Sequence, residues 1–212
     1  MKNQNIPMRK LFMSLCALLV SLTALTARAQ TATVIDPQRD AFYSKGDEAP
    51  AFLDILAASF TISDTLTFTV DVAGSLDALP DPSGFGGEFF WHFGLDTDPS
   101  TFPPGFPEPP GVTAPPEFTV DAFWDGTAFS GGFLDRRPEL TGGSALQYSI
   151  PVSVSGTRIT LTVPAALAAQ VQPLPGATWN CRTGWNNTFL LGIGTNAIHD
   201  ADSLPSRQPW PQ

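Results

Sequence analysis

The chain has 212 residues, of which 42% are hydrophobic, and a formal net charge of −9 that arises from 11 basic and 20 acidic residues. A surface with this excess of acid repels nucleic acid and anionic lipid, which argues against partners of either class. It favours solubility and, where carboxylates converge, the binding of hard cations such as calcium.

The first 29 residues have the pattern of a cleavable export signal. A basic stretch with Lys2, Arg9 and Lys10 precedes an apolar run over residues 11–25, and Ala27-Arg28-Ala29 forms an A-x-A cleavage site. The apolar run is shorter than the roughly 20 residues that a transmembrane helix needs. We therefore predict cleavage after Ala29, export to the periplasm or the extracellular space, and no permanent membrane anchor.

Removal of this signal leaves residues 30–212, a length typical of one domain. Seven basic and twenty acidic residues then remain, which is a net charge of −13. Cys16 leaves with the signal, so Cys181 has no partner for an internal disulfide. We predict that Cys181 is a small core residue, and the alternative is a reactive thiol.

Short segments rich in Thr, Val, Ile and Phe recur between clusters of Gly, Pro, Asp and Ser, which is typical of an antiparallel sandwich. Over residues 66–71 apolar and polar residues alternate as L-T-F-T-V-D, so one face of that strand should be buried and the other wet. The predicted strands are 54–63, 65–71, 88–95, 117–124, 128–135, 145–153 and 158–163, with further strands near Trp179 and at 189–193.

The connections also have recognisable signals. Asp125-Gly126 predicts a tight hairpin, and Gly156 predicts a second turn before the strand at 158–163. A short helix is predicted at 164–171, where a proline precedes an alanine-rich run.

Two stretches are predicted to be loops, 79–87 and the proline-rich segment 99–116. The prolines of the second cannot supply the amide N–H groups that a sheet requires, and a loop of this length is either a binding loop or a surface insertion. We therefore predict an all-β fold: an antiparallel two-sheet sandwich, jelly-roll or immunoglobulin-like, with one short helix, as a single domain over 30–212.

Acidic residues gather at two places in the first half of the chain. Asp36, Asp40 and Asp54 surround a turn-rich segment, and Asp96 and Asp98 follow an aromatic strand in G-L-D-T-D-P. Calcium takes six to eight oxygen ligands, which acidic loops at strand ends can provide. These five aspartates are our candidate metal ligands, and the alternative is that they cap turns on the surface.

The same residues resemble a known group of proteins. The aspartate pair, the D-I that opens a strand, the L-T-F-T-V strand and the D-T-D resemble calcium-associated, secreted β-sandwiches that include family 9 carbohydrate-binding modules and DOMON-type domains. Asp36, Asp40 and Asp54 would match the acidic opening, and Asp96 and Asp98 the D-T-D. The resemblance, over residues 36–98, implies a jelly-roll-like sandwich that binds a sugar, or haem in some relatives. The proline-rich insertion departs from that pattern.

Four tryptophans are candidates for ligand binding, because an indole offers a flat apolar face to a sugar ring and one donor to its hydroxyl groups. The alternative is that they belong to the core. The candidates are Trp91, Trp124, Trp179 and Trp185.

Haem is not expected. Its iron would need an axial His or Met, and beyond the signal only His92 and His199 are available. His92, between two aromatic residues, is interpreted as a packed or strand-surface residue, and His199 as part of a polar tail or turn.

No common hydrolase or zinc signature is present in the sequence. Glu88, Glu117, Asp121 and Asp135 would be the acid and base candidates of a glycoside hydrolase, but sequence spacing does not determine the separation of carboxylates that this chemistry requires. The alternative is that these carboxylates point outward along strands.

We therefore predict an exported, non-catalytic β-sandwich protein that binds a carbohydrate, with a calcium site. The alternatives are a structural or surface-associated protein without a small-molecule ligand and a glycoside hydrolase.

Overall fold

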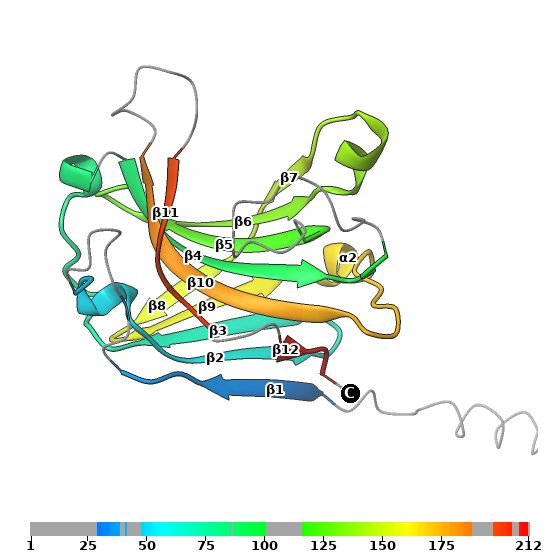
Figure 1. Cartoon of the computed structure of the whole chain (residues 1–212), viewed down its shortest axis with the longest axis horizontal. Coiled ribbons are helices and arrows are strands. Elements are labelled where there is room, and N and C mark those ends of the chain that lie inside the picture. The colour runs from blue at the N-terminus through cyan, green and yellow to red at the C-terminus, as the bar shows by residue number, and fades with distance from the viewer. Residues whose placement is uncertain are drawn as a thin grey trace, which may run out of the picture.

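The computed structural model describes residues 29–38, 41, 48–85, 87–100, 116–187, 197–204 and 208–211. These residues form two antiparallel sheets that pack face to face (Figure 1). The first sheet has the order β1-β2-β3-β9-β8, with the strands β1 (Gln30–Ile35), β2 (Ile55–Ile62), β3 (Leu66–Val72), β8 (Val152–Ser155) and β9 (Arg158–Val163). We call it the five-stranded sheet.

The second sheet has the order β11-β10-β4-β5-β6-β7. Its seventh strand, β12, lies outside this order and pairs with β10. Its strands are β4 (Gly87–Asp96), β5 (Phe118–Trp124), β6 (Phe129–Asp135), β7 (Leu146–Ser149), β10 (Thr178–Asn187), β11 (Ala197–Ser203) and β12 (Gln208–Pro209). We call it the seven-stranded sheet. The predicted all-β, two-sheet sandwich is thus confirmed.

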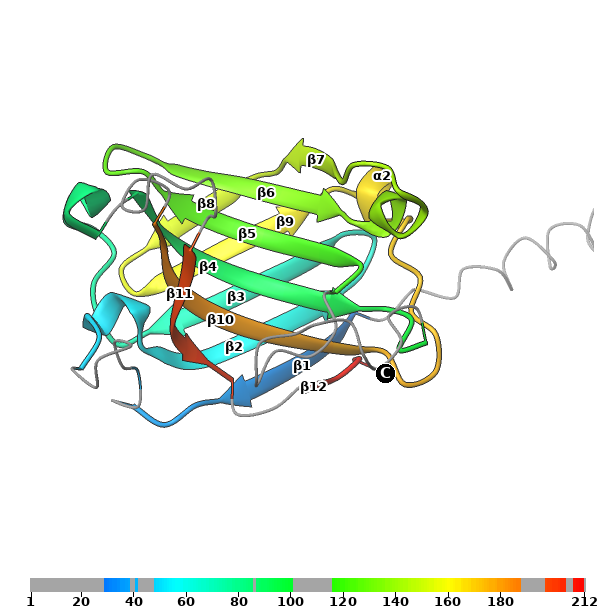
Figure 2. The same cartoon turned by 45° about the horizontal axis from the view of Figure 1, so that its top comes forward.

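The helical segments of the described chain are short. They are the 3-10 helices η1 (Ala51–Leu53), η2 (Pro82–Phe85) and η3 (Arg137–Thr141) and the α-helix α2 (Ala165–Ala168). The predicted helix is therefore present but shorter than 164–171. Figure 2 shows α2 and η3 at the same end of the sandwich, where β4 and β6 end.

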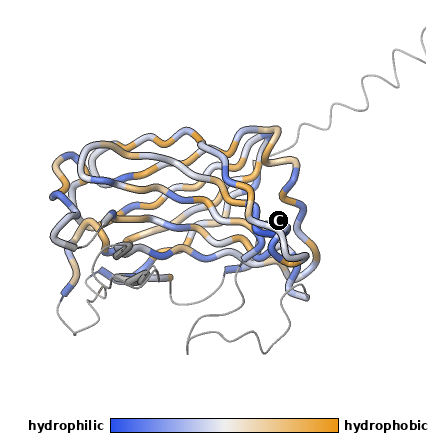
Figure 3. Tube along the Cα trace, turned by 90° about the horizontal axis from the view of Figure 1, so that it is seen from above, coloured by the Kyte–Doolittle hydropathy of each residue, from blue (hydrophilic) through white to orange (hydrophobic). Residues whose placement is uncertain are grey.

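The two sheets bury one continuous apolar core between them. Apolar and polar residues alternate along the strands, as Figure 3 shows, and this places one set of side chains inside. Phe68 of β3 meets Phe93 of β4 across the core with ring centroids 5.1 Å apart, and Phe60 of β2 lies 6.2 Å from Trp179 of β10. Aromatic contacts between the sheets therefore hold the two layers together.

One predicted strand is wrong. The segment 145–153 is not a single strand, because β7 belongs to the seven-stranded sheet and β8 to the five-stranded sheet. Pro151 lies between them and has no N–H to continue a ladder, while the Ile150 N–H donates to the Gly131 carbonyl oxygen at 3.0 Å. A Cβ at position 131 would lie 2.5 Å from the Ile150 carbonyl oxygen, so this crossover needs a glycine.

Three strands are absent from the sequence-based prediction: β1, β11 and β12. β1 directly follows the predicted cleavage site, and β11 includes His199, which was assigned to a tail or turn. The strand near Trp179 is confirmed as β10, whereas the prediction for 189–193 lies outside the described residues. The hairpin at Asp125-Gly126 is confirmed, with Gly126 at φ 98°.

Candidate functional site

A cavity of about 510 Å³ opens at the end of the sandwich that carries η3 and α2. The ends of β4 and β6, the start of β5, and the chain that follows α2 contribute its walls. Its polar lining consists of Thr97, Asp98, Glu117, Arg137, Gln170 and Gln172, and its apolar lining of Phe118, Leu140 and Leu174. Ligand sites are typically concave, of about 300–1,000 Å³, and combine apolar walls with a few polar groups.

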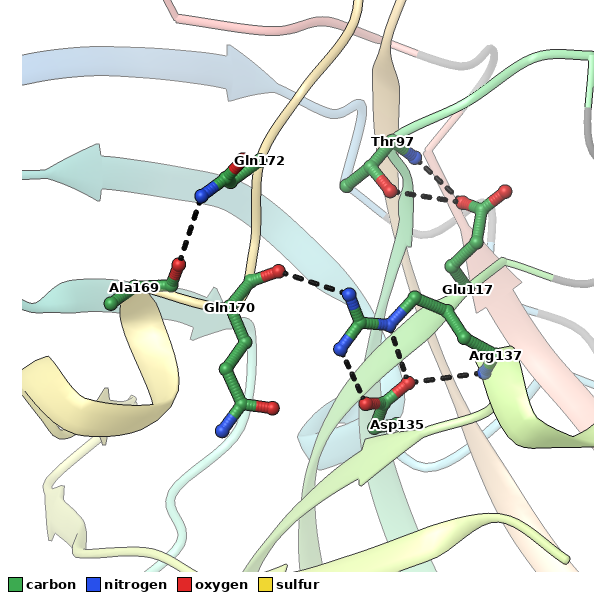
Figure 4. Close-up of polar contacts among 7 residues, drawn as sticks. All are labelled: Thr97, Glu117, Asp135, Arg137, Ala169, Gln170 and Gln172. Atoms are coloured by element: carbon green, nitrogen blue, oxygen red, sulfur yellow. Dashed lines mark hydrogen bonds and ion pairs between the residues drawn. The ribbon is translucent and has the colours of Figure 1, made fainter.

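One wall is built on an ion pair. Asp135, the last residue of β6, pairs in register with Phe118 of β5, so both side chains point to the same side of the sheet. Arg137 follows two residues later and donates from Nε to Asp135 Oδ1 at 2.9 Å and from Nη2 to Oδ2 at 2.6 Å (Figure 4). Its guanidinium lies 4.5 Å from the centre of the Phe118 ring. The bidentate geometry and the ring fix the orientation of the guanidinium.

The ion pair shifts the pKa values of both Asp135 and Arg137. The hydrogen bond from Arg137 is the main cause that lowers the pKa of Asp135, against the opposing effect of burial, and the same bond raises the pKa of Arg137. Arg137 Nη1 also donates to the Gln170 carbonyl oxygen at 3.3 Å. The positive charge of Arg137 is therefore already balanced by Asp135.

Glu117 is the buried carboxylate of the cavity, with 2% of its surface exposed. Its Oε2 accepts hydrogen bonds from the backbone N–H of Thr97 at 2.7 Å and from Thr97 Oγ1 at 3.3 Å (Figure 4). Its Oε1 is buried and has no hydrogen-bond partner. A buried carboxylate oxygen without a donor costs free energy, so Glu117 has capacity for one more hydrogen bond.

The candidate tryptophans do not line this cavity. Trp91 and Trp179 are core residues, 0% and 1% exposed, and their Nε1 groups donate to the carbonyl oxygens of Phe52 and Pro209, each at 3.1 Å. For these two the predicted stacking platform is wrong, because neither ring has a free face. Trp185 is 7% exposed. Trp124 is half-buried and donates to the Pro80 carbonyl oxygen at 3.1 Å.

The candidate metal ligands lie at two places. The Asp36 N–H donates to the Leu56 carbonyl oxygen at 2.9 Å, which places Asp36 close to Asp54 at the start of β2. The Trp91 indole donates a hydrogen bond to the Phe52 carbonyl oxygen, two residues before Asp54. Asp96 lies five residues further along β4 than Trp91, and five residues of strand span roughly 17 Å, so Asp96 is far from Asp54. Asp98, just beyond β4, lines the cavity. The four predicted aspartates within the described residues, Asp36, Asp54, Asp96 and Asp98, therefore do not converge on one site.

Within the described part of the chain, no group of three or more His, Cys, Asp or Glu side chains is arranged to hold a metal. Asp40 lies outside the described residues. Asp202, which sequence reasoning missed, accepts a hydrogen bond from the Ile55 N–H at 2.6 Å, directly after Asp54. The calcium site stays a prediction: a chelator should lower the melting temperature and Asp54→Ala should mimic it, whereas an unchanged melting curve would exclude a stabilising ion.

The carboxylates considered for hydrolysis are mostly buried rather than directed to solvent. Glu117, Asp121 and Asp135 are 2%, 9% and 3% exposed. Asp121 Oδ1 lies 2.6 Å from His92 Nδ1, and its Oδ2 accepts from Thr119 Oγ1 at 2.7 Å. The expected outward orientation is wrong for Asp135, which lies on the same side of the sheet as the core residue Phe118. Asp121 does lie on the outer face, because the core residues Val120 and Ala122 flank it in β5, but it is buried there beside His92 and Thr119.

The prediction for Cys181 is confirmed. Cys181 is a core residue with 0% exposure, and burial raises the pKa of its thiol well above the usual value. The arginine pair Arg136-Arg137 binds neighbouring carboxylates, with Arg136 Nε 2.9 Å from Glu139 Oε2.

Thr97, Gln170 and Gln172 are site residues that sequence reasoning missed. Gln172 Nε2 donates to the Ala169 carbonyl oxygen at 3.5 Å (Figure 4). The one signal in the sequence was the charge pattern D-R-R at the end of β6, which marks the wall with Asp135 and Arg137.

Comparison of the chain with protein-family models, with curated proteins and with solved structures finds no match. Among the described residues, no helix has the length and apolar character required to span a membrane. The cavity is therefore the feature of the described structure that bears on function.

Proposed function

We propose that this protein is an exported, non-catalytic binding protein that takes a carbohydrate ligand in the cavity between η3 and α2. The observation that supports this most is the composition of the cavity. Carboxylate, guanidinium and amide groups lie beside the exposed aliphatic side chains of Leu140 and Leu174, which are 41% and 51% exposed. A sugar ring presents hydroxyl groups at its edge and C–H groups on its faces, so it can use both kinds of lining.

The amide side chains favour a neutral, hydroxylated ligand. Gln170 and Gln172 each have one acceptor and two donors, which can bond the paired hydroxyl groups of a sugar. An anionic ligand is disfavoured, since Asp98 and Glu117 line the same space and Arg137 is balanced by Asp135.

Hydrolysis is the weaker candidate. An acid or base must be free to exchange a proton with the substrate, and Asp135 is held by two hydrogen bonds from the Arg137 side chain and one from its backbone. Asp121 is likewise held by His92 and Thr119. The two carboxylates in the cavity lining, Glu117 and Asp98, also already accept hydrogen bonds. Glu117 Oε2 accepts from Thr97, and Asp98 Oδ1 accepts from the Ser100 N–H at 3.0 Å and from Ser100 Oγ at 2.6 Å.

Calorimetric titration against a panel of soluble oligosaccharides tests the proposal. We expect heat of binding with at least one glycan and weaker binding by Gln172→Ala, whose side chain is exposed on the cavity wall. Gln147→Ala is the matched control, because Gln147 is an exposed glutamine on β7 that does not line the cavity. Absence of heat with every glycan, or an equal loss in both variants, would contradict the proposal.

A further inference from the structure

The strand β1 leaves one side of its backbone open at the edge of the five-stranded sheet (Figure 1). The Asp36 N–H donates to the Leu56 carbonyl oxygen at 2.9 Å, so the backbone of Asp36 faces β2. In an antiparallel pair the backbone groups of successive residues point alternately toward the partner strand and away from it. The N–H and C=O groups of Thr31, Thr33 and Ile35 therefore point away from β2, and among the described residues β1 pairs with no other strand.

This edge lacks the features that protect the other edges of the described sheets. Exposed edges can pair with further strands, and proteins usually keep them short or place charges or prolines on them. β7 and β8 have four residues each, β12 has two and contains Pro209, and β11 contains Asp200 and Asp202. β1 has six residues, Q-T-A-T-V-I, without a charge or a proline. It includes Ile35, which at 74% is the most exposed large hydrophobic residue of the described chain.

A second copy of the same strand fits this edge. When two β1 strands run antiparallel with Thr33 of each copy at a twofold axis, Thr31 of each copy lies opposite Ile35 of the other. These pairs use all of the open N–H and C=O groups, because opposed residues of this kind exchange two hydrogen bonds per pair. Opposed side chains lie on the same face, so Thr31 covers part of the exposed Ile35. Asp36 lies opposite Gln30 of the other copy, so the pairing sets no carboxylate against another.

We infer that β1 is an interaction surface for a second copy of this chain, and that the pairing joins two five-stranded sheets into one continuous sheet. The occupant follows from self-complementarity, since the same six residues supply both halves of the ladder and bring no like charges together. The interface is closed by its twofold symmetry, so it produces a dimer and not a filament. No residue of β1 lines the cavity, so the inference is independent of the proposed carbohydrate binding.

Sedimentation velocity of the whole protein measures the association. The concentration is varied from about 1 to about 500 µM, at physiological ionic strength so that repulsion between the acidic surfaces is screened. An edge of six residues is a small interface. We therefore expect a dimer with a dissociation constant on the order of 10 µM.

Two substitutions of Thr33 should weaken the dimer at least about tenfold. Thr33→Pro removes an N–H at the twofold axis but spares the ladder with β2, because an edge strand tolerates proline where the N–H faces solvent. Thr33→Lys places two like charges opposite each other. Ser153→Lys is the matched control, since Ser153 is exposed and lies in register with Thr33 across the sheet, but on the opposite edge strand β8. It should leave the dimer unchanged, and melting curves establish that the variants fold.

Spin labels on Thr69→Cys locate the interface. Thr69 lies on the outer face of β3 and is in register with Thr33 through Ser59 of β2. Five strand spacings of about 4.8 Å would separate the two labelled residues of the dimer, which is a distance of about 24 Å. Cys181 is 0% exposed, so it stays unlabelled. Pulsed electron paramagnetic resonance measures the separation.

Several outcomes overturn the inference. One is a monomer mass over the whole range of concentrations, including a monomer that instead binds an added strand peptide at this edge, because the partner would then be a different chain. Another is a dimer that both Thr33 variants retain, or that Ser153→Lys weakens equally, since the contact would then lie elsewhere or depend on overall charge. A label separation beyond about 40 Å, well above the five strand spacings, also excludes pairing through β1.

Discussion

The two sheets of this protein use their polar residues in different ways. On the outer face of the five-stranded sheet, cross-strand neighbours form two rows of hydroxyl side chains, without a charge in either row. The first row is Thr31, Thr61, Thr67 and Thr162, and the second is Thr33, Ser59, Thr69, Thr160 and Ser153. Thr31 and Thr61 are hydrogen-bonded through their hydroxyl groups at 2.8 Å. In these two rows the sheet alternates, with apolar residues inside and hydroxyl groups outside, and beyond them the outer face carries one ion pair between Asp71 and Arg158.

The seven-stranded sheet instead buries charged residues. Asp96, Asp121, Asp135 and Asp202 lie in its strands and are each at most 9% exposed, and Glu117 directly precedes β5. Burying a carboxylate costs free energy unless hydrogen bonds or cations compensate its charge. Such groups cluster at functional sites. The five-stranded sheet is therefore the scaffold of the fold, whereas the buried carboxylates and the cavity belong to the seven-stranded sheet and its connections.

The largest change in the free energy of unfolding is expected from a substitution in the core of the five-stranded sheet. Phe68 is fully buried, stacks on Phe60 with ring centroids 4.5 Å apart and reaches Phe93 of the opposite sheet. Phe68→Ala should lower the free energy of unfolding by about 3–5 kcal/mol, because it removes buried apolar area and leaves a cavity between the sheets. Urea denaturation measures this loss. A change below about 1 kcal/mol would mean that the core is not packed as described.

The next largest effect is expected at the cavity wall. Asp135→Asn removes the charge to which Arg137 binds and should cost about 1–3 kcal/mol, the range for hydrogen bonds to charged groups. Glu139→Gln breaks the more exposed pair with Arg136 and should cost about 0–1 kcal/mol. Equal losses in the two variants, measured by urea denaturation, would show that the Asp135 pair is no stronger than a surface ion pair.

A pH dependence should accompany the Asp135 pair. The pKa of Asp135 is lowered in the folded protein, mainly by Arg137, so the pair stabilises the fold at pH values above the unfolded pKa of about 3.9. That stabilisation is lost as the pH falls through the lower, folded pKa. The difference in melting temperature between the unmodified protein and Asp135→Asn should therefore be constant near neutral pH and shrink below about pH 4. A difference that grows on acidification would contradict the assigned direction.

The smallest change in the free energy of unfolding is expected from a substitution in the hydroxyl rows. Thr69 lies on the same strand as Phe68 but faces outward, and Thr69→Val keeps the branched shape while it removes the hydroxyl group. The free energy of unfolding should change by no more than about 0.5 kcal/mol. A loss comparable to that of Phe68→Ala would show that the outer face is covered by a contact that the described residues do not contain.

Local sequence pattern was sufficient for most of the scaffold. The alternation over residues 66–71 predicted β3 and its buried face, and Asp125-Gly126 predicted the hairpin between β5 and β6, because both signals depend only on neighbouring residues. The ion pair between Asp135 and Arg137 could have been predicted for the same reason, because the two residues are only two positions apart. Where a strand changes sheets, as at Pro151, local pattern predicted the extended segments but not the crossover.

The sequence by itself therefore determined the class of fold, the approximate places of most strands and the acidic character of the surface. Only the tertiary structure decided which tryptophans are buried, that Thr97 binds Glu117 across 20 residues, and that Asp202 binds the start of β2 across 147 residues. The physical reason is that alternation specifies two faces of a strand but does not say which neighbour covers each face. Partners that are distant in sequence meet only when the sheets have paired and packed.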